Sequence, residues 1–358
     1  MDTRRLDLRH SATFAEILSE PGVWQTALGG LRKDPVISSI VEDSRSRAEW
    51  LFLGCGTSFY LAEAAASSWT LLTGQRARAL PASEPLLFPK LALAQTPNLQ
   101  AVVISRSGKT SEVLRAATMF AGEFRVPTIG ITCATNSPLE EICDVTIRIT
   151  AADEKSTVMT RSFTSMLLAL QHLAARSVKN ESYLKSLENM AVHFAPQIQA
   201  IAEKVQGFVE KHSFEDYVFL GQGPFHGIAR EASLKVMEMS CSYGQVFHTL
   251  EFRHGPKAIV SPNTCLTFFL GENGYQAEEE VLGEMAELGG VIIAICNRAS
   301  EHVRRNSALV FELGFDGPDV ARLAPYVVPA QLLGFFTGTK KNLDPDNPKN
   351  LTRVVILD

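Results

Sequence analysis

The chain has 358 residues, with 34 lysines and arginines, 39 acidic residues and a formal net charge of −5. Hydrophobic residues make up 46% and charged residues 20%, as is typical of a globular protein. At about 150 residues per domain, the length predicts two domains. The acidic balance disfavours nucleic acid as a partner, and no apolar run approaches the ~20 residues that span a bilayer. The first residues lack the apolar core of a signal peptide, so we expect a cytoplasmic protein with no membrane partner.

Six cysteines are scattered along the sequence without a close Cys-x-x-Cys pair. Cys133, Cys265 and Cys296 lie in or beside apolar runs. We therefore expect buried, reduced thiols, which is the ordinary state of cysteine in the cytosol. A zinc site needs clustered ligands, and the sequence shows no such cluster, so no metal is predicted.

Short apolar runs rich in β-branched residues alternate with longer helical patterns in the first half of the chain. The runs cover residues 50–54, 101–105, 127–132 and 145–149. This alternation is typical of β-α-β units and predicts a parallel sheet covered by helices.

The same order of segments then occurs a second time. Residues 49–56 read EWLFLGCG and residues 216–223 read DYVFLGQG, and a helical pattern follows each. The stretch 101–132 runs strand, loop, helix and strand, and the stretch 265–296 has the same plan. The predicted fold class is therefore α/β, with two copies of a flavodoxin-like three-layer α/β/α domain.

These patterns divide the chain into five parts. They are an N-terminal helical extension (1–34), a first α/β domain (35–180), a helical linker (181–204), a second α/β domain (205–340) and a C-terminal tail (341–358). We expect one helix over 13–28 and another over 183–211.

Residues 105–110, which read SRSGKT, carry the strongest local signal. They follow an apolar strand and precede a helix, where free N–H groups and a partial positive charge favour an anion. The hydroxyls of Ser105, Ser107 and Thr110 add hydrogen-bond donors. Gly108 lets the backbone approach the anion closely. The loop is predicted to bind a phosphate; an ordinary capped turn is the alternative.

The same loop contains Gly-Lys-Thr but does not match a nucleotide P-loop. That motif needs a glycine five residues before Gly108, and this position is Val103. The equivalent loop of the second copy, 271–274, has no hydroxyl and contains an acid. We therefore predict a single phosphate site, in the first copy.

Residues 54–58, which read GCGTS, also follow a strand. A dinucleotide fingerprint needs a further glycine where the chain has Phe59. Adjacent strands would instead bring Thr57 and Ser58 towards the phosphate loop. A tight turn without a binding role is the alternative.

Residues 230–239, REASLKVMEM, carry Glu231, Lys235 and Glu238 at positions i, i+4 and i+7, on one face of the expected helix. Their neighbours are apolar. A carboxylate in such surroundings can have the raised proton affinity of a general base, with Lys235 adjusting it. A solvated ion-pair face is the alternative.

His254 lies in the segment 251–256, EFRHGP. Histidine transfers protons at neutral pH, and the following Gly-Pro predicts a fixed turn. A structural loop histidine is the alternative.

Together these segments resemble the sugar isomerase (SIS) family with two SIS domains. The similarity is to the isomerase part of the glucosamine-6-phosphate synthases and to stand-alone amino-sugar-phosphate isomerases, deaminases and fructosamine-6-phosphate deglycases. It rests on residues 54–58 (GCGTS), 105–110 (SRSGKT), 161–165 (RSFTS), 231–238 (EASLKVME), 251–256 (EFRHGP) and 346–354 (DNPKNLTRV). The resemblance implies two tandem SIS domains.

The resemblance also implies roles for individual residues. The sugar phosphate would be bound by Thr57, Ser58, Ser105, Arg106 (through its backbone), Ser107, Gly108 and Thr110. Glu238 would move a proton between C1 and C2, beside Lys235 and Glu231. His254 would open the sugar ring, and in the family this histidine is donated across a homodimer with shared active sites.

One position departs from the synthases. Their residue at the position of Arg353 is a lysine that forms a Schiff base, which a permanently protonated arginine cannot do. Arg353 is expected to bind an anion or hydroxyl instead. We also expect no glutaminase domain and so no direct use of glutamine.

The sequence thus predicts isomerising deamination of an amino-sugar 6-phosphate, without cofactor or metal. Plain ketose–aldose isomerisation, deglycation of a fructosamine 6-phosphate and non-enzymatic phosphosugar sensing are the alternatives.

Overall fold

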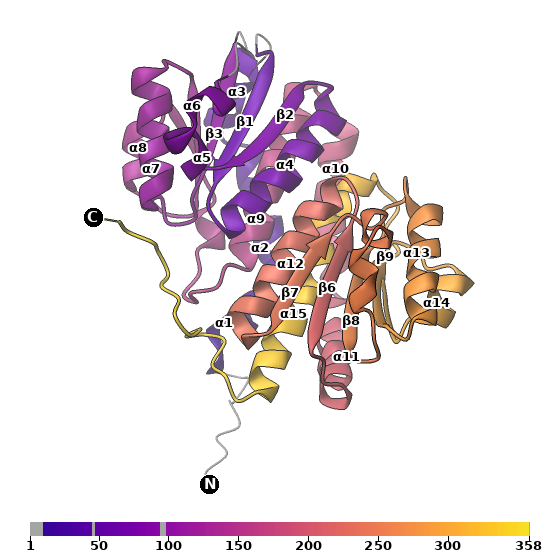
Figure 1. Cartoon of the computed structure of the whole chain (residues 1–358). Coiled ribbons are helices and arrows are strands. Elements are labelled where there is room, and N and C mark those ends of the chain that lie inside the picture. The colour runs from indigo at the N-terminus through magenta and orange to yellow at the C-terminus, as the bar shows by residue number, and fades with distance from the viewer. Residues whose placement is uncertain (1–9, 45–46, 94–97, 358) are drawn as a thin grey trace. The chain divides into compact units, whose positions relative to one another are not determined.

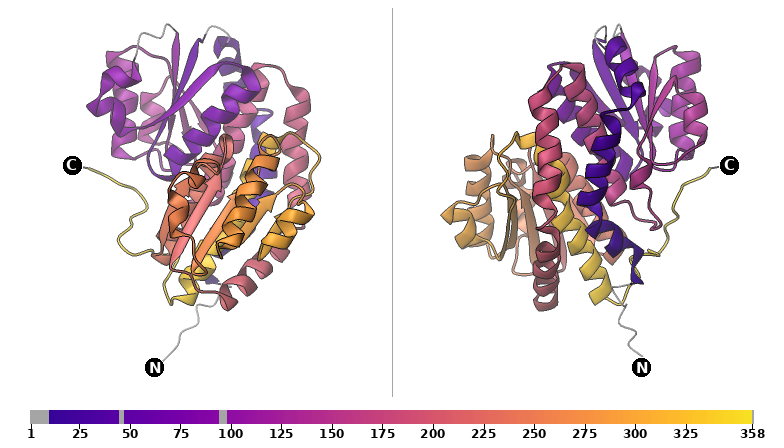
Figure 2. Two further views of the ribbon diagram at one scale, coloured as in Figure 1. Left: turned by 45° about the vertical axis from the view of Figure 1, so that its right-hand side comes forward. Right: turned by 180° about the vertical axis from the view of Figure 1, so that it is seen from behind.

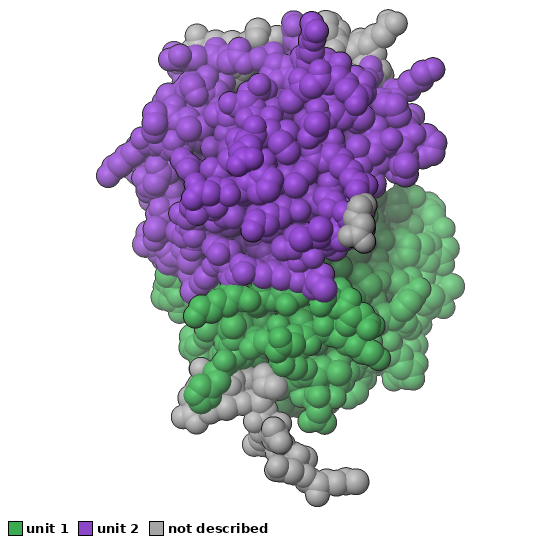
Figure 3. All heavy atoms as spheres, turned by 90° about the vertical axis from the view of Figure 1, so that its left-hand side faces the viewer, with its two compact units in different colours: residues 1–18, 155–160, 193–351 green, residues 19–154, 161–192, 352–358 purple. Residues whose placement is uncertain are grey.

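The computed structural model describes residues 10–44, 47–93 and 98–357 (Figure 1). Residues 1–9 of the predicted N-terminal extension and Asp358 of the predicted tail lie outside them. The chain forms two compact units (Figure 3). Unit 1 comprises the described residues of 1–18, 155–160 and 193–351, and unit 2 those of 19–154, 161–192 and 352–358.

Unit 2 contains a parallel five-stranded sheet with the order β2-β1-β3-β4-β5. The strands are β1 (Glu49–Gly54), β2 (Arg76–Pro81), β3 (Leu99–Ile104), β4 (Thr128–Thr132) and β5 (Val145–Arg148). The helical segments are α2 (Glu20–Leu31), α3 (Pro35–Ser44), α4 (Thr57–Thr73), α5 (Ser83–Leu87), α6 (Pro89–Ala92), α7 (Ser111–Thr118), η2 (Met119–Glu123), α8 (Pro138–Ile142), η3 (Thr150–Ala152), α9 (Arg161–Ser177) and most of α10 (Glu181–Phe194). Helices α4 and α9 cover one face of the sheet, and α7 and α8 cover the other (Figure 1).

The hydrophobic core of unit 2 lies on both faces of the sheet, because successive strand residues point to opposite sides. On one side, Leu51 and Leu53 of β1 pack in a cluster with Phe120. On the other, the rings of Trp50 and Trp69 are 3.9 Å apart. Burial on both faces explains why the central strands read as continuous apolar runs.

Unit 1 contains a second parallel five-stranded sheet, with the order β10-β9-β8-β6-β7. The strands are β6 (Asp216–Gly221), β7 (Tyr243–Phe247), β8 (Thr264–Phe269), β9 (Val291–Cys296) and β10 (Leu309–Glu312). The helical segments are α1 (Ala12–Leu18), α11 (Ile198–Lys211), α12 (Pro224–Ser240), η4 (Glu251–Arg253), η5 (Pro256–Ile259), α13 (Tyr275–Glu287), α14 (Glu301–Asn306), η6 (Asp319–Arg322) and α15 (Leu323–Lys340). Helices α12 and α15 pack together on one face, and α13 and α14 lie on the other (Figure 2).

The predicted fold class is confirmed, since each unit is a parallel sheet between two helical layers. Two expected helices are each divided in two. The helix expected over 13–28 is α1 and α2, which separate at Ser19, and the helix expected over 183–211 is α10 and α11. Pro196 lies at the second break, where it has no N–H to continue a helical ladder.

Among the six cysteines, all free, four are buried as expected: Cys133, Cys143, Cys265 and Cys296. The expectation is wrong for Cys241, which is exposed, and only partly right for Cys55. Cys241 follows the last turn of α12 with φ +48°, where the chain leaves the helix at the surface.

Glu278 is a buried acid beneath the loop that follows β8. Its side chain lies in the first turn of α13, and Thr249 Oγ1 donates a hydrogen bond of 2.7 Å to its Oε2. Burial raises the pKa of Glu278 to about 7, although hydrogen bonds from Thr249 and the Gly271 backbone partly oppose the shift. The charge of Asp319 raises this pKa further.

We expect this acid to make the fold less stable as pH rises. The folded chain holds the Glu278 proton up to about pH 7, whereas the unfolded chain loses it near pH 4.5, so the free energy of unfolding falls between these values. In urea titrations at pH 5 and pH 8, Glu278→Gln should therefore gain stability relative to wild type at pH 8, by up to about 3 kcal/mol. The exposed Glu287 of the same helix provides the control Glu287→Gln. The expectation is contradicted if the free energy of unfolding changes between pH 5 and pH 8 by the same amount in Glu278→Gln as in wild type.

Candidate functional site

The loop Ser105–Thr110 of unit 2, here called the serine loop, joins β3 to α7. Its three hydroxyls converge, with Ser105 Oγ 3.0 Å from Thr110 Oγ1 and 3.5 Å from Ser107 Oγ. Gly108 has φ +62°, and a Cβ there would come within 2.4 Å of the Ser137 side chain. Glycine is thus the residue that this turn accepts. The loop presents a cluster of hydroxyl donors at the N-terminus of a helix, which suits a phosphate.

The Arg106 side chain pairs with an acid of the protein. It is buried, and its Nη1 lies 3.3 Å from Glu154 Oε2. Its backbone carbonyl accepts hydrogen bonds from Thr132 Oγ1 and the Cys133 N–H, both at 3.0 Å. The side chain therefore fixes the loop to neighbouring segments, and Glu154 neutralises its charge.

The C-terminal residues of unit 2 lie against the serine loop. Arg106 Nη2 donates to the Arg353 carbonyl at 2.9 Å, and the Ser111 N–H donates to the Val355 carbonyl at 3.3 Å. The Arg353 guanidinium itself donates to Asp153 Oδ1 at 2.9 Å and to the Glu154 carbonyl. Residues 352–357 are thus anchored beside the predicted phosphate site.

Thr57 and Ser58 begin α4, at the carboxyl end of β1. Because β1 pairs with β3, these residues share the carboxyl edge of the sheet with the serine loop. Both residues are buried, with 5% of their surface exposed. A Cβ at Gly54 would lie 2.4 Å from the Ser58 carbonyl, so the chain passes closely from strand to helix.

Helix α12 of unit 1 carries the predicted acid–base residues on one buried face. Lys235 Nζ lies 3.3 Å from Glu231 Oε1 and 2.5 Å from Glu238 Oε2. The side chains of Glu231 and Lys235 are 0% exposed, whereas that of Glu238 is 19% exposed. Of these three charged groups, Glu238 is the one that a substrate can reach.

The charge of Lys235 is maintained by its two neighbours. Burial lowers the pKa of the lysine, but the carboxylates of Glu231 and Glu238 outweigh this effect and leave the pKa raised. Lys235 therefore stays protonated at neutral pH.

Close helix packing buries this charged face. A Cβ at Gly334 of α15 would lie 2.7 Å from the Lys235 carbonyl, and a Cβ at Gly338 would lie 2.1 Å from the Met239 carbonyl. These glycines, which lack a Cβ, let α15 approach the backbone of α12 closely.

His254 follows η4 and is exposed, with its backbone N–H bonded to the Glu251 carbonyl at 3.0 Å. It belongs to a different segment of unit 1 from α12. The structure therefore brings together Glu231, Lys235 and Glu238 on one helix, whereas His254 comes from the loop after η4.

Sequence reasoning missed Glu154, which pairs with Arg106. Ser162 donates two hydrogen bonds to this carboxylate, from its backbone N–H and its hydroxyl. The pair is separated by 48 residues in sequence, and no local motif signals it.

The described helices include none long and apolar enough to cross a membrane.

Residues 45–176 match the family model of the SIS domain. This part of the chain is therefore similar to a SIS domain, and the sheet of unit 1 has the same strand order as the sheet of unit 2. The resemblance to the isomerase part of the glucosamine-6-phosphate synthases and their stand-alone relatives is confirmed.

Two curated relatives illustrate this similarity. The glutamine–fructose-6-phosphate aminotransferase (isomerizing) of Haemophilus influenzae is 26% identical over 324 residues, which is 86% of this chain and 51% of that protein. A candidate D-galactosamine-6-phosphate deaminase, AgaS, of Streptomyces coelicolor is 26% identical over 359 residues, 94% of this chain and 91% of that protein. The chain spans about half the length of the aminotransferases that it matches.

Among solved structures, the glucosamine-6-phosphate deaminase of Thermotoga maritima is similar with a TM-score of 0.76 and 28% identity. The match covers 97% of this chain and 100% of that one. These relatives include phosphosugar isomerases and deaminases.

Proposed function

We propose that the chain is a sugar-phosphate enzyme that isomerises and deaminates an amino-sugar 6-phosphate. The observation that carries the proposal is the acid–base group of α12. There a buried, protonated Lys235 lies between two carboxylates, and Glu238 alone of the three reaches solvent. Such a carboxylate suits reversible proton transfer at carbon.

In this proposal the serine loop of unit 2 binds the phosphate. The hydroxyls of Ser105, Ser107 and Thr110, together with the backbone near Arg106, donate to its oxygens. Thr57 and Ser58 line the same edge of the sheet. Binding energy from the unreactive phosphate holds the reacting carbons in position.

Unit 1 supplies the proton transfer. His254, by resemblance, assists ring opening to the aldehyde. Glu238 removes the proton from C2, the electron pair forms a C1=C2 double bond, and the aldehyde oxygen takes up a proton to give an enolamine. Glu238 then returns its proton to C1 while the amine nitrogen loses one, which leaves an imine at C2 and a hydroxyl at C1. Water then hydrolyses the imine, releasing ammonia and the ketose 6-phosphate.

Two similar proteins support this substrate class, since their names describe deaminases of glucosamine 6-phosphate and of D-galactosamine 6-phosphate. By the same resemblance we propose a homodimer with shared active sites, in which His254 is donated to the partner. In sedimentation equilibrium this proposal predicts a mass of twice 39.2 kDa.

A panel of substrates separates the proposed reaction from its alternatives. The chain would be incubated with hexosamine 6-phosphates, ketohexose 6-phosphates and fructosamine 6-phosphates, with ammonia and sugars measured together. Ammonia from a hexosamine 6-phosphate supports the proposal. Interconversion of sugars without ammonia would indicate a plain isomerase, amino-acid release a deglycase, and binding without turnover a sensor.

Ser107→Ala tests the phosphate role of the serine loop. Loss of one hydrogen bond to a charged oxygen costs about 1.5–3 kcal/mol, so KM for the phosphorylated substrate should rise about 10- to 100-fold. A smaller change is expected in kcat. Ser182→Ala, at an exposed position on α10, is the control. If KM for Ser107→Ala equals that of wild type, the loop does not bind the phosphate.

A further inference from the structure

The two units correspond residue by residue at the carboxyl edges of their sheets. The strand β3 occupies the same place in its sheet as β8 does in the other. The Ser105 N–H donates to the Ile131 carbonyl of β4 at 3.0 Å, and the Leu270 N–H donates to the Ile295 carbonyl of β9 at 2.9 Å. Leu270 is thus the equivalent of Ser105. Two residues further on, Glu272 stands where unit 2 has Ser107.

A cavity of about 450 Å³ lies at this edge of unit 1. Its lining comes from the segments that follow β8, β9 and β10 and from η6, and includes Glu272, Asn297, Asp316 and Arg322. Ligands of parallel α/β sheets bind at this place. The cavity is large enough for a monosaccharide and lies entirely within unit 1.

Glu272 is held in position by its neighbours. Its Oε1 lies 2.7 Å from Arg322 Nη1 and accepts a 3.0 Å hydrogen bond from Asn297 Nδ2. Its backbone N–H donates to Asp319 Oδ2 at 2.8 Å. Both side-chain contacts end on Oε1 and the side chain is 53% exposed, which leaves Oε2 as an acceptor for a ligand.

Arg322 fixes one wall of the cavity. Its side chain is 2% exposed, and its Nη2 donates to the Phe315 carbonyl at 3.2 Å and to the Gly317 carbonyl. The guanidinium that a ligand can reach is that of Arg298, which lines the cavity and is 69% exposed. The cavity therefore offers a ligand both an acceptor and a donor, the pair that a hydroxyl group uses.

An acid takes the position of a phosphate-binding hydroxyl in this cavity. The lining holds two carboxylates, Glu272 and Asp316, and two guanidinium groups, Arg298 and Arg322, so their charges balance. Arg298 Nη2 pairs with Asp316 Oδ1 at 2.6 Å, and Arg322 Nη1 pairs with Glu272 Oε1 at 2.7 Å. The serine position of unit 2 is thus replaced by an acid, which repels the phosphate that a hydroxyl would bind.

We propose that this cavity is a second ligand site, for a small organic cation that bears hydroxyl groups, such as a protonated, unphosphorylated amino sugar. The ammonium group binds Glu272, and ring hydroxyls bind Asn297 and Arg298. The site is separate from the proposed reaction and does not depend on turnover.

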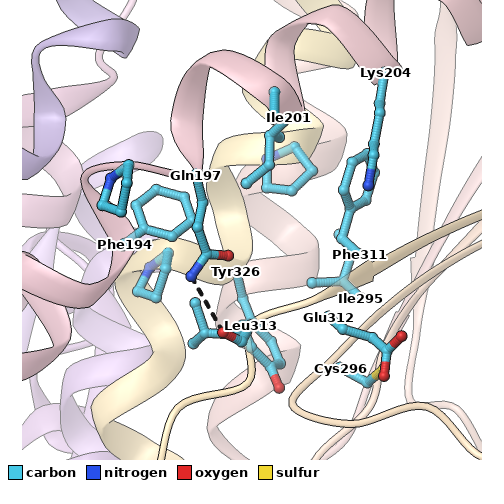
Figure 4. Close-up of a pocket in the computed structure, with 14 residues that line it drawn as sticks. Phe194, Gln197, Ile201, Lys204, Ile295, Cys296, Phe311, Glu312, Leu313 and Tyr326 are labelled. Carbon is cyan, nitrogen blue, oxygen red and sulfur yellow. Dashed lines mark hydrogen bonds between the residues drawn. The ribbon is translucent and has the colours of Figure 1, made fainter.

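Another cavity of unit 1 provides the contrast (Figure 4). It measures about 280 Å³, and apolar side chains such as Ile201 and Phe311 make up most of its lining. The Gln197 amide in its wall is bonded to the Leu313 carbonyl at 3.2 Å. Glu312 also lines this cavity, so Glu312→Gln removes one acid outside the proposed site and serves as the matched control.

The test is calorimetric titration of the full chain at pH 7 with D-glucosamine, D-glucose and inorganic phosphate. We expect glucosamine to bind at least about 10-fold more tightly than glucose, since a charged hydrogen bond contributes the difference. Saturating phosphate should not displace glucosamine. Glu272→Gln should weaken glucosamine binding about 10-fold, whereas Glu312→Gln and Ser107→Ala should leave it unchanged.

A second variant tests the site independently if the first one fails to fold. Asp316 is 88% exposed, and Asp316→Asn should preserve the fold while weakening glucosamine binding several-fold. No glucosamine binding to wild type, or full binding by both variants, overturns the proposal. Loss of binding in Ser107→Ala, or displacement by phosphate, also overturns it because the ligand then occupies the serine loop.

Discussion

Glu238→Gln is expected to abolish turnover while leaving hexosamine 6-phosphate binding intact. Glutamine has the shape of glutamate and can still accept a hydrogen bond from Lys235, but it cannot take a proton from carbon. Acid–base catalysis contributes about 10²- to 10⁴-fold, so kcat should fall by about 10³-fold or more. Because the phosphate is bound elsewhere in the proposal, affinity should change little.

The measurement pairs kinetics with binding. Ammonia release and sugar interconversion give kcat, and calorimetry with the same hexosamine 6-phosphate gives the dissociation constant. Glu203→Gln, at an exposed position of α11, controls for the loss of one acidic group. Wild-type turnover by Glu238→Gln would remove Glu238 from the mechanism.

Lys235→Met should be among the most destabilising substitutions in unit 1. The lysine side chain is 0% exposed and is the cation between Glu231 and Glu238. Removing one partner of a buried ionic group leaves uncompensated charge and costs about 3–5 kcal/mol. The free energy of unfolding at pH 7, from urea titration, should fall by that amount.

The double variant Glu231→Gln/Lys235→Met distinguishes loss of charge pairing from loss of packing. With the buried negative charge also removed, part of the lost stability should return. If the single variant loses less than about 1 kcal/mol, or the double variant recovers nothing, the buried charge pairing does not stabilise this face.

The repeated α/β plan could be predicted because central parallel strands are buried on both faces. Strands such as β1 and β9 therefore read as nearly continuous apolar runs. The edge strands β2 (RARALP) and β7 (YGQVF) escaped prediction, since their residues are only partly buried and show no such run. Tertiary pairing, rather than local sequence, makes them strands.

The candidate site was predictable where its residues are close in sequence. The i, i+4, i+7 spacing correctly indicates that Glu231, Lys235 and Glu238 meet on one helical face. Their burial was not predictable, because it depends on Gly334 and Gly338, about a hundred residues further along the chain. The same limit applied to the distant pair of Arg106 and Glu154, which the sequence analysis missed.

Arg353 shows how a tertiary partner changes an expectation. From sequence, its guanidinium was expected to bind an anion or a hydroxyl of the substrate. In the structure it donates to Asp153 and to the Glu154 carbonyl, while its own carbonyl accepts from Arg106. A role in substrate binding stays a prediction.

The most direct test of the central claim uses a hexosamine 6-phosphate that carries deuterium at C2. NMR would follow the label while ammonia is measured in the same sample. The proposal predicts that deuterium leaves C2, for C1 of the ketose or for water, in step with equimolar ammonia release. Retention of the label at C2 without ammonia, across the hexosamine 6-phosphates, would contradict it.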